Sequence, residues 1–428
     1  MNLLIKNGTL IDPVLKKGRK ASVLIEGGRI VKIKEGELQS DYETINADGK
    51  IVSPGFIDIH VHFRDPGYEH KEDIHSGLQA AAAGGYTSVC TMPNTDPVAD
   101  NVDTVNYVTE KASSGNGVKL YPVSAATMGL KGKVLAPLEE LKSAGVVAFS
   151  DDGRPLENTA LLKRSMEYGS KLGLKYISHS EDLYLSEGAQ MNDSVHATAL
   201  GVTGVPVVGE ASQIARDCMM AEYLDVPIHI AHVSTAMSVD IIQYFKERGV
   251  KVTAETAPHY LTLTDESVKN FNSDAKMNPP LRGEKDRLAL IRGVKAGIID
   301  CISTDHAPHH EKEKEVDLKY APFGIIGLET AFPVVMKLFH GGILSIERIV
   351  ELFTNGYSIM GIEGGAIAEG SLADLTIFDP DYEWTIDKKK FFSKSRNTPF
   401  HGLNVKGAVL YTVVNGKVVF RGNCDVCS

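Results

Sequence analysis

The sequence predicts an α/β protein: a (β/α)8 TIM barrel with a small β-sandwich domain formed by the N- and C-terminal segments. In the middle of the chain, short apolar runs alternate with helical patterns, and polar residues follow many of these runs. Barrel enzymes place their active-site side chains at the carboxyl ends of the strands. A doubly wound sheet is the alternative, and the recurrence of polar residues at the strand ends favours the barrel.

Both ends of the chain have the pattern of short strands and turns. Glu26-Gly27-Gly28 is typical of a hairpin turn, and Asn415-Gly416 is a strong hairpin signal. Neither end has enough apolar sequence for a core alone. We therefore expect residues 1–54 plus 365–428 to form one composite domain and residues 55–364 to form the barrel. The expected terminal strands are residues 3–6, 21–25, 29–33, 43–45, 375–378, 408–414 and 417–420.

The expected barrel consists of eight strand-like runs with helical patterns between them. The strands are residues 57–62, 86–91, 119–124, 146–150, 175–178, 228–232, 252–255 and 299–304. The helical patterns include residues 77–83, 161–172, 210–223, 237–247 and 286–296. The crowded charges of residues 311–315 are typical of a solvated loop or helix, and a lid over the site is the alternative.

Bulk properties narrow the class of protein. The 428 residues carry a formal net charge of -10, which argues against nucleic acid or an anionic membrane as the main partner. No apolar run approaches the roughly 18–20 residues of a membrane span. The N-terminus lacks a signal-peptide pattern, so a cytoplasmic location is the default. Five scattered cysteines make no disulfide framework, and the CxxC of Cys424 and Cys427 is a weak signal for metal binding or redox chemistry.

Two histidines one residue apart end the first expected barrel strand. Apolar Ile57, Ile59 and Val61 alternate there with polar residues that include His60 and His62. Alternate side chains of a strand share a face, so both imidazoles point the same way. This arrangement suits two ligands of one metal ion.

Further candidate ligands follow later strands: Asp151 and Asp152, then His179, His232 and Asp305. Four histidines with two or three aspartates can hold two divalent ions if one carboxylate bridges them. Imidazole and carboxylate ligands favour Zn²⁺, although Mn²⁺, Co²⁺ or Fe²⁺ could take their place. Strand parity turns His229 away from His232, so we interpret His229 as structural.

Five motifs lie along the chain: DIHVHFRDPG at residues 58–67, MPNT at 92–95, KMNPPLR at 276–282, STDHAPH at 303–309 and APFGIIGLET at 321–330. Together they resemble the motifs of the dihydroorotases of the bacterial type I class, within the amidohydrolase superfamily. The resemblance covers nearly the whole chain. Many superfamily members bridge two metals with a carboxylated lysine after the fourth strand, where this chain has no lysine. The resemblance implies one or two Zn²⁺ per subunit, with the Asp152 carboxylate bridging the two ions. Asp151 is the alternative bridging residue.

The resemblance also implies a substrate that carries one carboxylate. Arg64 lies two residues past His62, so strand parity predicts that its side chain points to the same end of the barrel as His62. A guanidinium there can bind a carboxylate in bidentate fashion. Asn94 and His309 can add donors to that carboxylate. The implied substrate-binding residues are His62, Arg64, Asn94, Asn278, His309, and the backbone of Phe323 and Gly324.

The implied reaction is the reversible cyclisation of N-carbamoyl-L-aspartate to L-dihydroorotate in pyrimidine biosynthesis. It would use metal-bound hydroxide, with Asp305 as general acid and base. Alternatives are a hydantoinase, dihydropyrimidinase or allantoinase, whose uncharged rings would not need Arg64, and a non-catalytic scaffold, which predicts missing ligands. The resemblance further implies a homodimer and an association with aspartate carbamoyltransferase.

Overall fold

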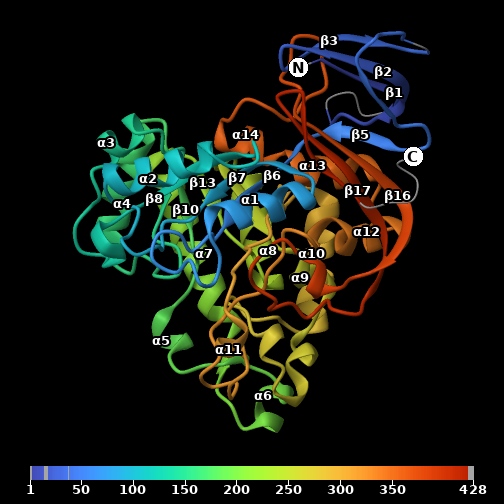
Figure 1. Ribbon diagram of the computed structural model, residues 1–428. Helices are drawn as coiled ribbons and strands as arrows, with labels where there is room; N and C mark the ends of the chain where they lie inside the picture. The colour runs from blue at the N-terminus through green and yellow to red at the C-terminus, as the bar shows by residue number, and fades with distance from the viewer. Residues whose placement is uncertain (1, 14–17, 37, 423–428) are drawn as a thin grey trace.

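Eight parallel strands form the centre of the computed structural model, which describes residues 2–13, 18–36 and 38–422 (Figure 1). They lie in the order β15-β14-β13-β10-β9-β8-β7-β6. Their bounds are β6 (Phe56–Val61), β7 (Tyr86–Thr91), β8 (Lys119–Ala125), β9 (Ala148–Ser150), β10 (Lys175–Ser178), β13 (Ile228–Ile230), β14 (Val252–Thr256) and β15 (Cys301–Ile302). A parallel bridge from Val61 to His306 joins the first strand to the segment after the last one, which closes the barrel.

The eight predicted barrel strands are confirmed, with shorter carboxyl ends at three of them. The strand expected at residues 57–62 ends at Val61, which leaves His62 just beyond it. The strand expected at residues 228–232 ends at Ile230, and the strand expected at 299–304 covers only Cys301–Ile302. His232 has φ 34° and Asp305 has φ 48°, which lie outside the extended region. The backbone therefore leaves the sheet just where the candidate ligands begin.

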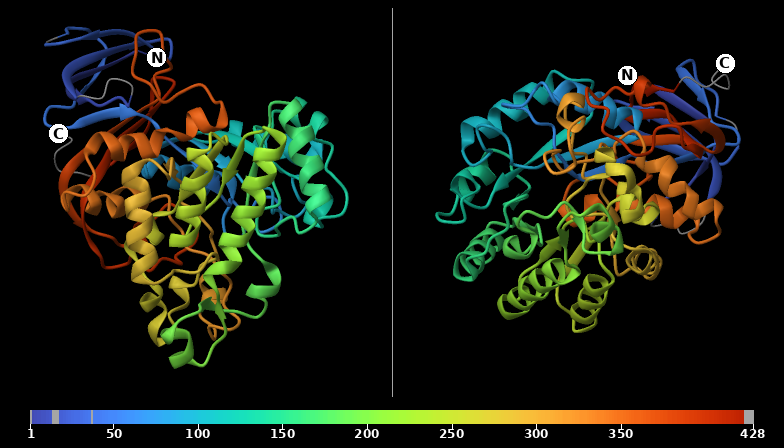
Figure 2. Two further views of the ribbon diagram at one scale, coloured as in Figure 1. Left: turned by 180° about the vertical axis from the view of Figure 1, so that it is seen from behind. Right: turned by 90° about the horizontal axis from the view of Figure 1, so that it is seen from below.

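Helices cover the outside of the barrel, and Figure 2 shows α7, α8 and α10 running side by side there. The α1 helix begins with a capping box in which Asp73 accepts from the Ser76 N–H and the Ser76 hydroxyl lies 3.2 Å from the Asp73 N–H. The helices are α1 (Ile74–Ala83), α2 (Val102–Ser113), α3 (Leu138–Ser143), α4 (Thr159–Lys171), α5 (Leu183–Ser186), α6 (Val195–Leu200), α7 (Val207–Leu224), α8 (Ala236–Glu247), α9 (Pro258–Thr262), α10 (Glu284–Ala296), α11 (Glu311–Lys314), α12 (Ala331–His340), α13 (Ile346–Thr354) and α14 (Gly356–Met360).

The two ends of the chain form a second, mixed sheet beside the barrel (Figure 1). Its strands are β1 (Leu3–Leu10), β2 (Arg19–Glu26), β3 (Arg29–Lys34), β4 (Glu43–Asn46), β5 (Ile51–Pro54), β16 (Leu375–Thr385), β17 (Asn404–Val414) and β18 (Lys417–Arg421). Antiparallel pairing of β5 with β16 joins the two ends. Ile5 and Val23 share a buried core with Leu375 and Val413, which confirms that the two terminal segments together build one β structure. The boundaries at residues 54 and 365 stay a prediction, and Cys424 and Cys427 lie outside the described residues.

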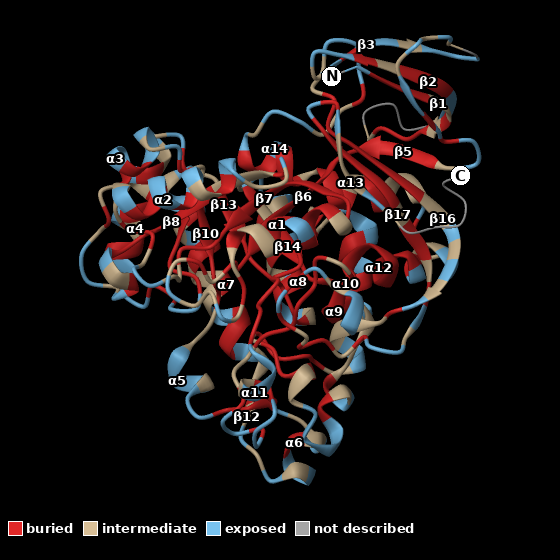
Figure 3. Ribbon diagram, in the orientation of Figure 1, coloured by how far each residue is buried: buried red, intermediate tan, exposed pale blue. Residues whose placement is uncertain are grey.

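Burial follows this architecture. Figure 3 shows buried residues concentrated along the barrel strands and the inner faces of the helices. The charged residues 311–315 include the short helix α11, in which Lys314 is buried rather than solvated. Within the described part of the chain, no helix is long and apolar enough to cross a membrane.

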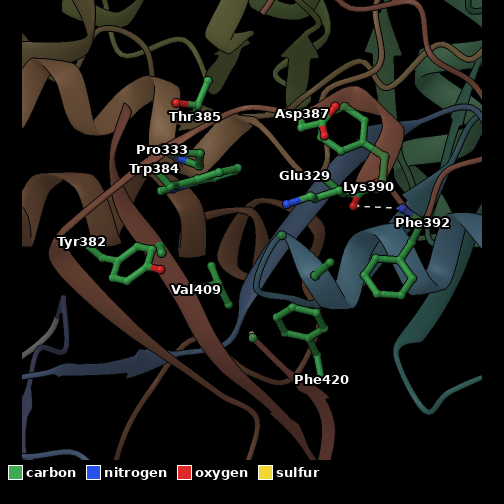
Figure 4. Close-up of a pocket in the computed structure, with 15 residues that line it drawn as sticks. Glu329, Pro333, Tyr382, Trp384, Thr385, Asp387, Lys390, Phe392, Val409 and Phe420 are labelled. Atoms are coloured by element: carbon green, nitrogen blue, oxygen red, sulfur yellow. Dashed lines mark hydrogen bonds between the residues drawn. The ribbon is translucent and has the colours of Figure 1, made fainter. Parts of the chain in front are cut away.

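A cavity of about 500 Å³ lies between the terminal sheet and helices α1 and α12 (Figure 4). Its wall includes the aromatic side chains of Trp384, Phe392 and Phe420. The carboxylate of Glu329 accepts the backbone N–H groups of Phe392 at 3.0 Å and Ser393 at 3.1 Å. Burial raises the pKa of Glu329 to about 7.

This raised pKa predicts a pH-dependent effect of E329Q. Between the ordinary carboxyl pKa and about 7, the folded state keeps a proton that the unfolded state has lost, so this group makes the free energy of unfolding fall as pH rises. Glutamine keeps an acceptor for the two N–H groups and removes this dependence. We expect the stability of E329Q relative to wild type to rise by about 2.5 kcal/mol from pH 5 to pH 8 in urea unfolding.

The matched control is E110Q, because Glu110 is exposed on α2. It should follow the wild-type pH dependence throughout. If the stability of E329Q also follows the wild-type pH dependence, the raised pKa of Glu329 is contradicted.

Candidate active site

Four imidazoles and two carboxylates meet at the carboxyl ends of the barrel strands. His60 lies within β6, and the others follow the ends of β6, β9, β10, β13 and β15. All six side chains are buried. The structure thus brings together the complete predicted set: His60, His62, Asp152, His179, His232 and Asp305.

Asp152 lies between two groups of histidines. Its Oδ1 atom lies 3.3 Å from His60 Nε2 and 3.3 Å from His179 Nδ1, and its Oδ2 atom lies 3.5 Å from His62 Nε2. Ligand atoms that share a tetrahedral ion at about 2.0–2.1 Å lie roughly 3.3–3.4 Å apart. The two Oδ1 distances match that spacing, and the Oδ2 distance is close to it.

Two orphaned polar atoms support the fit of a cation. His60 Nε2 and Asp152 Oδ1 are buried and have no hydrogen-bond partner among the described residues. Burying polar atoms without a partner is costly, and a divalent ion between them would satisfy both. Imidazole nitrogen with carboxylate oxygen is a donor set that zinc and similar ions prefer.

The structure separates Asp152 from its neighbour Asp151. The Asp151 carboxylate accepts the N–H groups of Ala126 at 2.8 Å and Thr127 at 2.9 Å, and it also accepts the Thr127 hydroxyl. Asp151 therefore ties the end of β9 to the segment after β8. This favours Asp152 as the residue between the histidines.

The carboxylates are held in their ionised form. Burial would raise the pKa of Asp305, but His60 and His62 lower it to about 2. Burial would likewise raise the pKa of Asp152, and the surrounding histidines hold it well below its usual range. Both groups are therefore anionic and suited to bind a cation.

Three residues at the site have backbone angles that side chains disfavour. Arg64, His232 and Asp305 have φ of 62°, 34° and 48°. Such residues cost about 1–3 kcal/mol each and cluster at functional sites. The sequence carried no signal for this strain.

The predicted substrate residues line a cavity of about 350 Å³ together with the histidine cluster. Arg64, Asn94, Asn278, His309 and Phe323 all contribute to its wall. Asn94 Oδ1 lies 2.8 Å from His62 Nδ1, so this amide also holds a candidate ligand.

Arg64 is the cation at this wall. Its Nε atom donates to Pro308 O at 3.2 Å, and within the described ranges no carboxylate forms a salt bridge with its guanidinium. Burial lowers the pKa of Arg64. An arginine so placed can pair with a carboxylate on a ligand.

Gly324 is the predicted substrate residue that the structure does not bring to the cavity. Its N–H donates to Lys276 O at 2.9 Å, and its carbonyl accepts from Lys314 Nζ at 3.1 Å. Its backbone groups are thus used within the protein.

Sequence reasoning missed two carboxylates at the site. Glu181 Oε2 lies 3.0 Å from His179 Nε2, and Glu255 Oε1 lies 2.8 Å from His60 Nδ1. Glu181 could have been found from its place two residues after His179. Glu255 ends a predicted strand but carries no local signal of its own.

Known proteins are similar to this chain in sequence and in fold. A sequence model of a family described as dihydro-orotase-like matches residues 49–238. Dihydroorotases of Acetivibrio thermocellus and Geobacter metallireducens are each 48% identical over 98% of this chain and cover 99% and 100% of their own lengths. Among solved structures, an L-hydantoinase (dihydropyrimidinase) from Arthrobacter aurescens has a TM-score of 0.88 at 25% identity, covering 98% of this chain and 96% of its own.

The geometry predicts different results for the two neighbouring aspartates. D152N should weaken zinc binding by about tenfold or more, which is about 1.4 kcal/mol, because it removes the charge between the histidines. D151N should lower thermal stability but leave zinc affinity near that of wild type. Zinc titration of chelator-treated protein, followed by calorimetry and thermal unfolding, measures both. If D151N lost zinc affinity and D152N kept it, Asp151 rather than Asp152 would be the metal ligand.

Proposed function

The chain belongs to the dihydroorotase family, and from that premise we propose that it catalyses the reversible cyclisation of N-carbamoyl-L-aspartate to L-dihydroorotate, in de novo pyrimidine (UMP) biosynthesis. Relatives at 48% identity over nearly the whole chain are named dihydroorotases. The structural neighbours are named hydantoinases and dihydropyrimidinases. The position of Arg64 is the observation that favours dihydroorotate over the uncharged rings.

Arg64 favours a ring that bears a carboxylate. Its side chain is half-buried and lines the cavity that the histidine cluster also borders. A cation that is partly removed from water without a carboxylate beside it is costly, and a substrate carboxylate would supply that opposite charge. An uncharged hydantoin or dihydropyrimidine ring has no such group.

We infer that the metal is Zn²⁺, with one or two ions per subunit. The residues that would hold it are His60, His62, Asp152, His179, His232 and Asp305. When bound, zinc lowers the pKa of the attacking water and polarises the amide carbonyl of the ring.

Asp305 would move the proton. In hydrolysis it takes the proton of the attacking water and gives it to the leaving ring nitrogen, as base and then acid. Its Oδ1 atom lies 3.1 Å from His62 Nε2, it lines the cavity, and its lowered pKa keeps it ionised as a base must be. In the direction of cyclisation these roles reverse.

Asn94, His309, Asn278 and Phe323 would orient the substrate. All four line the cavity beside Arg64 and Asp305. Asn94 and His309 would add hydrogen bonds to the substrate carboxylate, and Asn278 and the Phe323 backbone would bind the amide edges of the ring.

We also propose a cytoplasmic location. The buried free thiols of Cys90, Cys218 and Cys301 support it, because free cysteines persist in a reducing compartment. A homodimer and an association with aspartate carbamoyltransferase are expectations from the family resemblance. Sedimentation of the protein alone and with that enzyme measures both.

The central test is turnover of L-dihydroorotate, with dihydrouracil, hydantoin and allantoin as neutral competitors. We expect the zinc-loaded protein to prefer dihydroorotate. R64Q should lower kcat/KM for dihydroorotate by about 10²–10³-fold, or about 3–4 kcal/mol, with its zinc content unchanged. R164Q, at an exposed arginine of α4, is the matched control and should behave as wild type. Faster turnover of a neutral ring would contradict the proposal.

The equilibrium position should depend on pH. N-carbamoyl-L-aspartate has two carboxylates and L-dihydroorotate has one, so ring closure consumes a proton. Well above the carboxyl pKa, the ratio of dihydroorotate to carbamoyl aspartate should fall about tenfold for each pH unit. The enzyme should reach the same ratio from either side when both compounds are measured by chromatography. A ratio that does not change with pH would rule out the assigned chemistry.

A further inference from the structure

A buried carboxylate that the proposed mechanism does not use lies beneath the histidine cluster. Glu255 belongs to β14 and is 1% exposed. Its Oε1 atom lies 2.8 Å from Nδ1 of His60. It does not line the substrate cavity, so its contact with the site passes through His60.

The two ring nitrogens of His60 face different partners. Nδ1 faces Glu255, whereas Nε2 faces Asp152 at 3.3 Å and Asp305 at 3.6 Å. A neutral imidazole has one N–H, and a carboxylate at Nδ1 keeps that hydrogen there. The lone pair of Nε2 then points to the place between His60 and Asp152 where a cation fits.

Glu255 is itself held from the other side. Its second oxygen accepts the hydroxyl of Ser303 and lies 3.3 Å from Nε2 of His229. His229 in turn lies 2.9 Å, through Nδ1, from the Thr253 hydroxyl. The neighbouring strands β13 and β14 and the end of β15 thus fix one carboxylate.

We propose that Glu255 is a positioning residue for the metal centre: through its hydrogen bond with His60 it fixes the tautomer and the orientation of that ring. This rests on the proposed function, because it requires a metal at His60. Histidine ligands commonly donate their other ring N–H to a carboxylate, and loss of that partner commonly costs about 10–100-fold in metal affinity or activity.

A metal site at Glu255 itself is the alternative. The possible ligand atoms of His229, Glu255 and Cys301 lie within 4.8 Å of one another. However, one oxygen of Glu255 is engaged by His60 and the other accepts the Ser303 hydroxyl. These hydrogen bonds favour the positioning role.

The test is E255Q, which keeps the shape of the side chain and removes its charge. We expect its zinc affinity to fall about 10–100-fold in competition with a chromophoric chelator. The visible spectrum of the Co²⁺-substituted protein should also change. At saturating zinc, kcat should fall while KM for dihydroorotate stays near that of wild type, because Glu255 lies outside the substrate cavity.

E72Q is the matched control, because it breaks another buried pair of glutamate and histidine. Glu72 Oε2 lies 3.3 Å from His306 Nε2, and both side chains are buried. E72Q should lose thermal stability but keep a zinc affinity within about twofold of wild type, since His306 is not a predicted ligand. An equal loss of zinc in E72Q would show that E255Q acts through general destabilisation, and would overturn the proposal.

The remaining outcomes separate this proposal from the proposed function. Wild-type protein that neither binds zinc nor turns over dihydroorotate would overturn both. Normal wild-type behaviour with unchanged zinc affinity in E255Q would overturn the positioning role alone. If the wild-type protein bound a further zinc ion and C301S lost it, Glu255 would be a ligand of a second metal site, and the positioning role would be overturned. If E255Q does not fold, H229Q loosens the same carboxylate and should also weaken zinc binding, and an unchanged affinity would overturn the proposal.

Discussion

The placement of one buried carboxylate among four imidazoles governs the rest of the structure. Asp152 is almost wholly buried, and its oxygens face His60, His62, His179 and His232 at 3.3–3.8 Å. Charges buried in this way are stable only with partners in fixed geometry. Those partners come from strands far apart in the sequence, so the cluster requires a closed barrel.

Asp58 shows how the barrel meets this requirement. Its carboxylate accepts the backbone N–H of His60 at 3.1 Å and that of Thr304 at 3.1 Å. It therefore fastens the first strand to the segment that carries Asp305, at the seam where the barrel closes. The disfavoured backbone angles of His232 and Asp305 can persist because the surrounding strands hold them.

Much of this arrangement could be predicted from the sequence, because it follows from periodicity. Alternation along β6 and the residue after it placed His60 and His62 on one face, and the apolar runs located all eight barrel strands. The orientation of Arg64 was predicted for a reason that does not apply: Arg64 lies beyond the end of β6 with φ 62°, so strand parity cannot aim it. The choice between Asp151 and Asp152 depends on contacts with Ala126 and Thr127 that no local pattern reveals. Glu255 was missed for the same reason, since its partner His60 is 195 residues away.

The most direct measurement of the central claim is anomalous diffraction at the zinc edge from crystals of the zinc-loaded protein. The account predicts a peak beside the Asp152 carboxylate, next to His60 and His62 or next to His179 and His232, and two peaks if both sites fill. D152N crystals under the same conditions should lose density there. Zinc found only at another cluster, such as His229, Glu255 and Cys301, would contradict the account. Asp152 would then be a buried carboxylate that binds no metal.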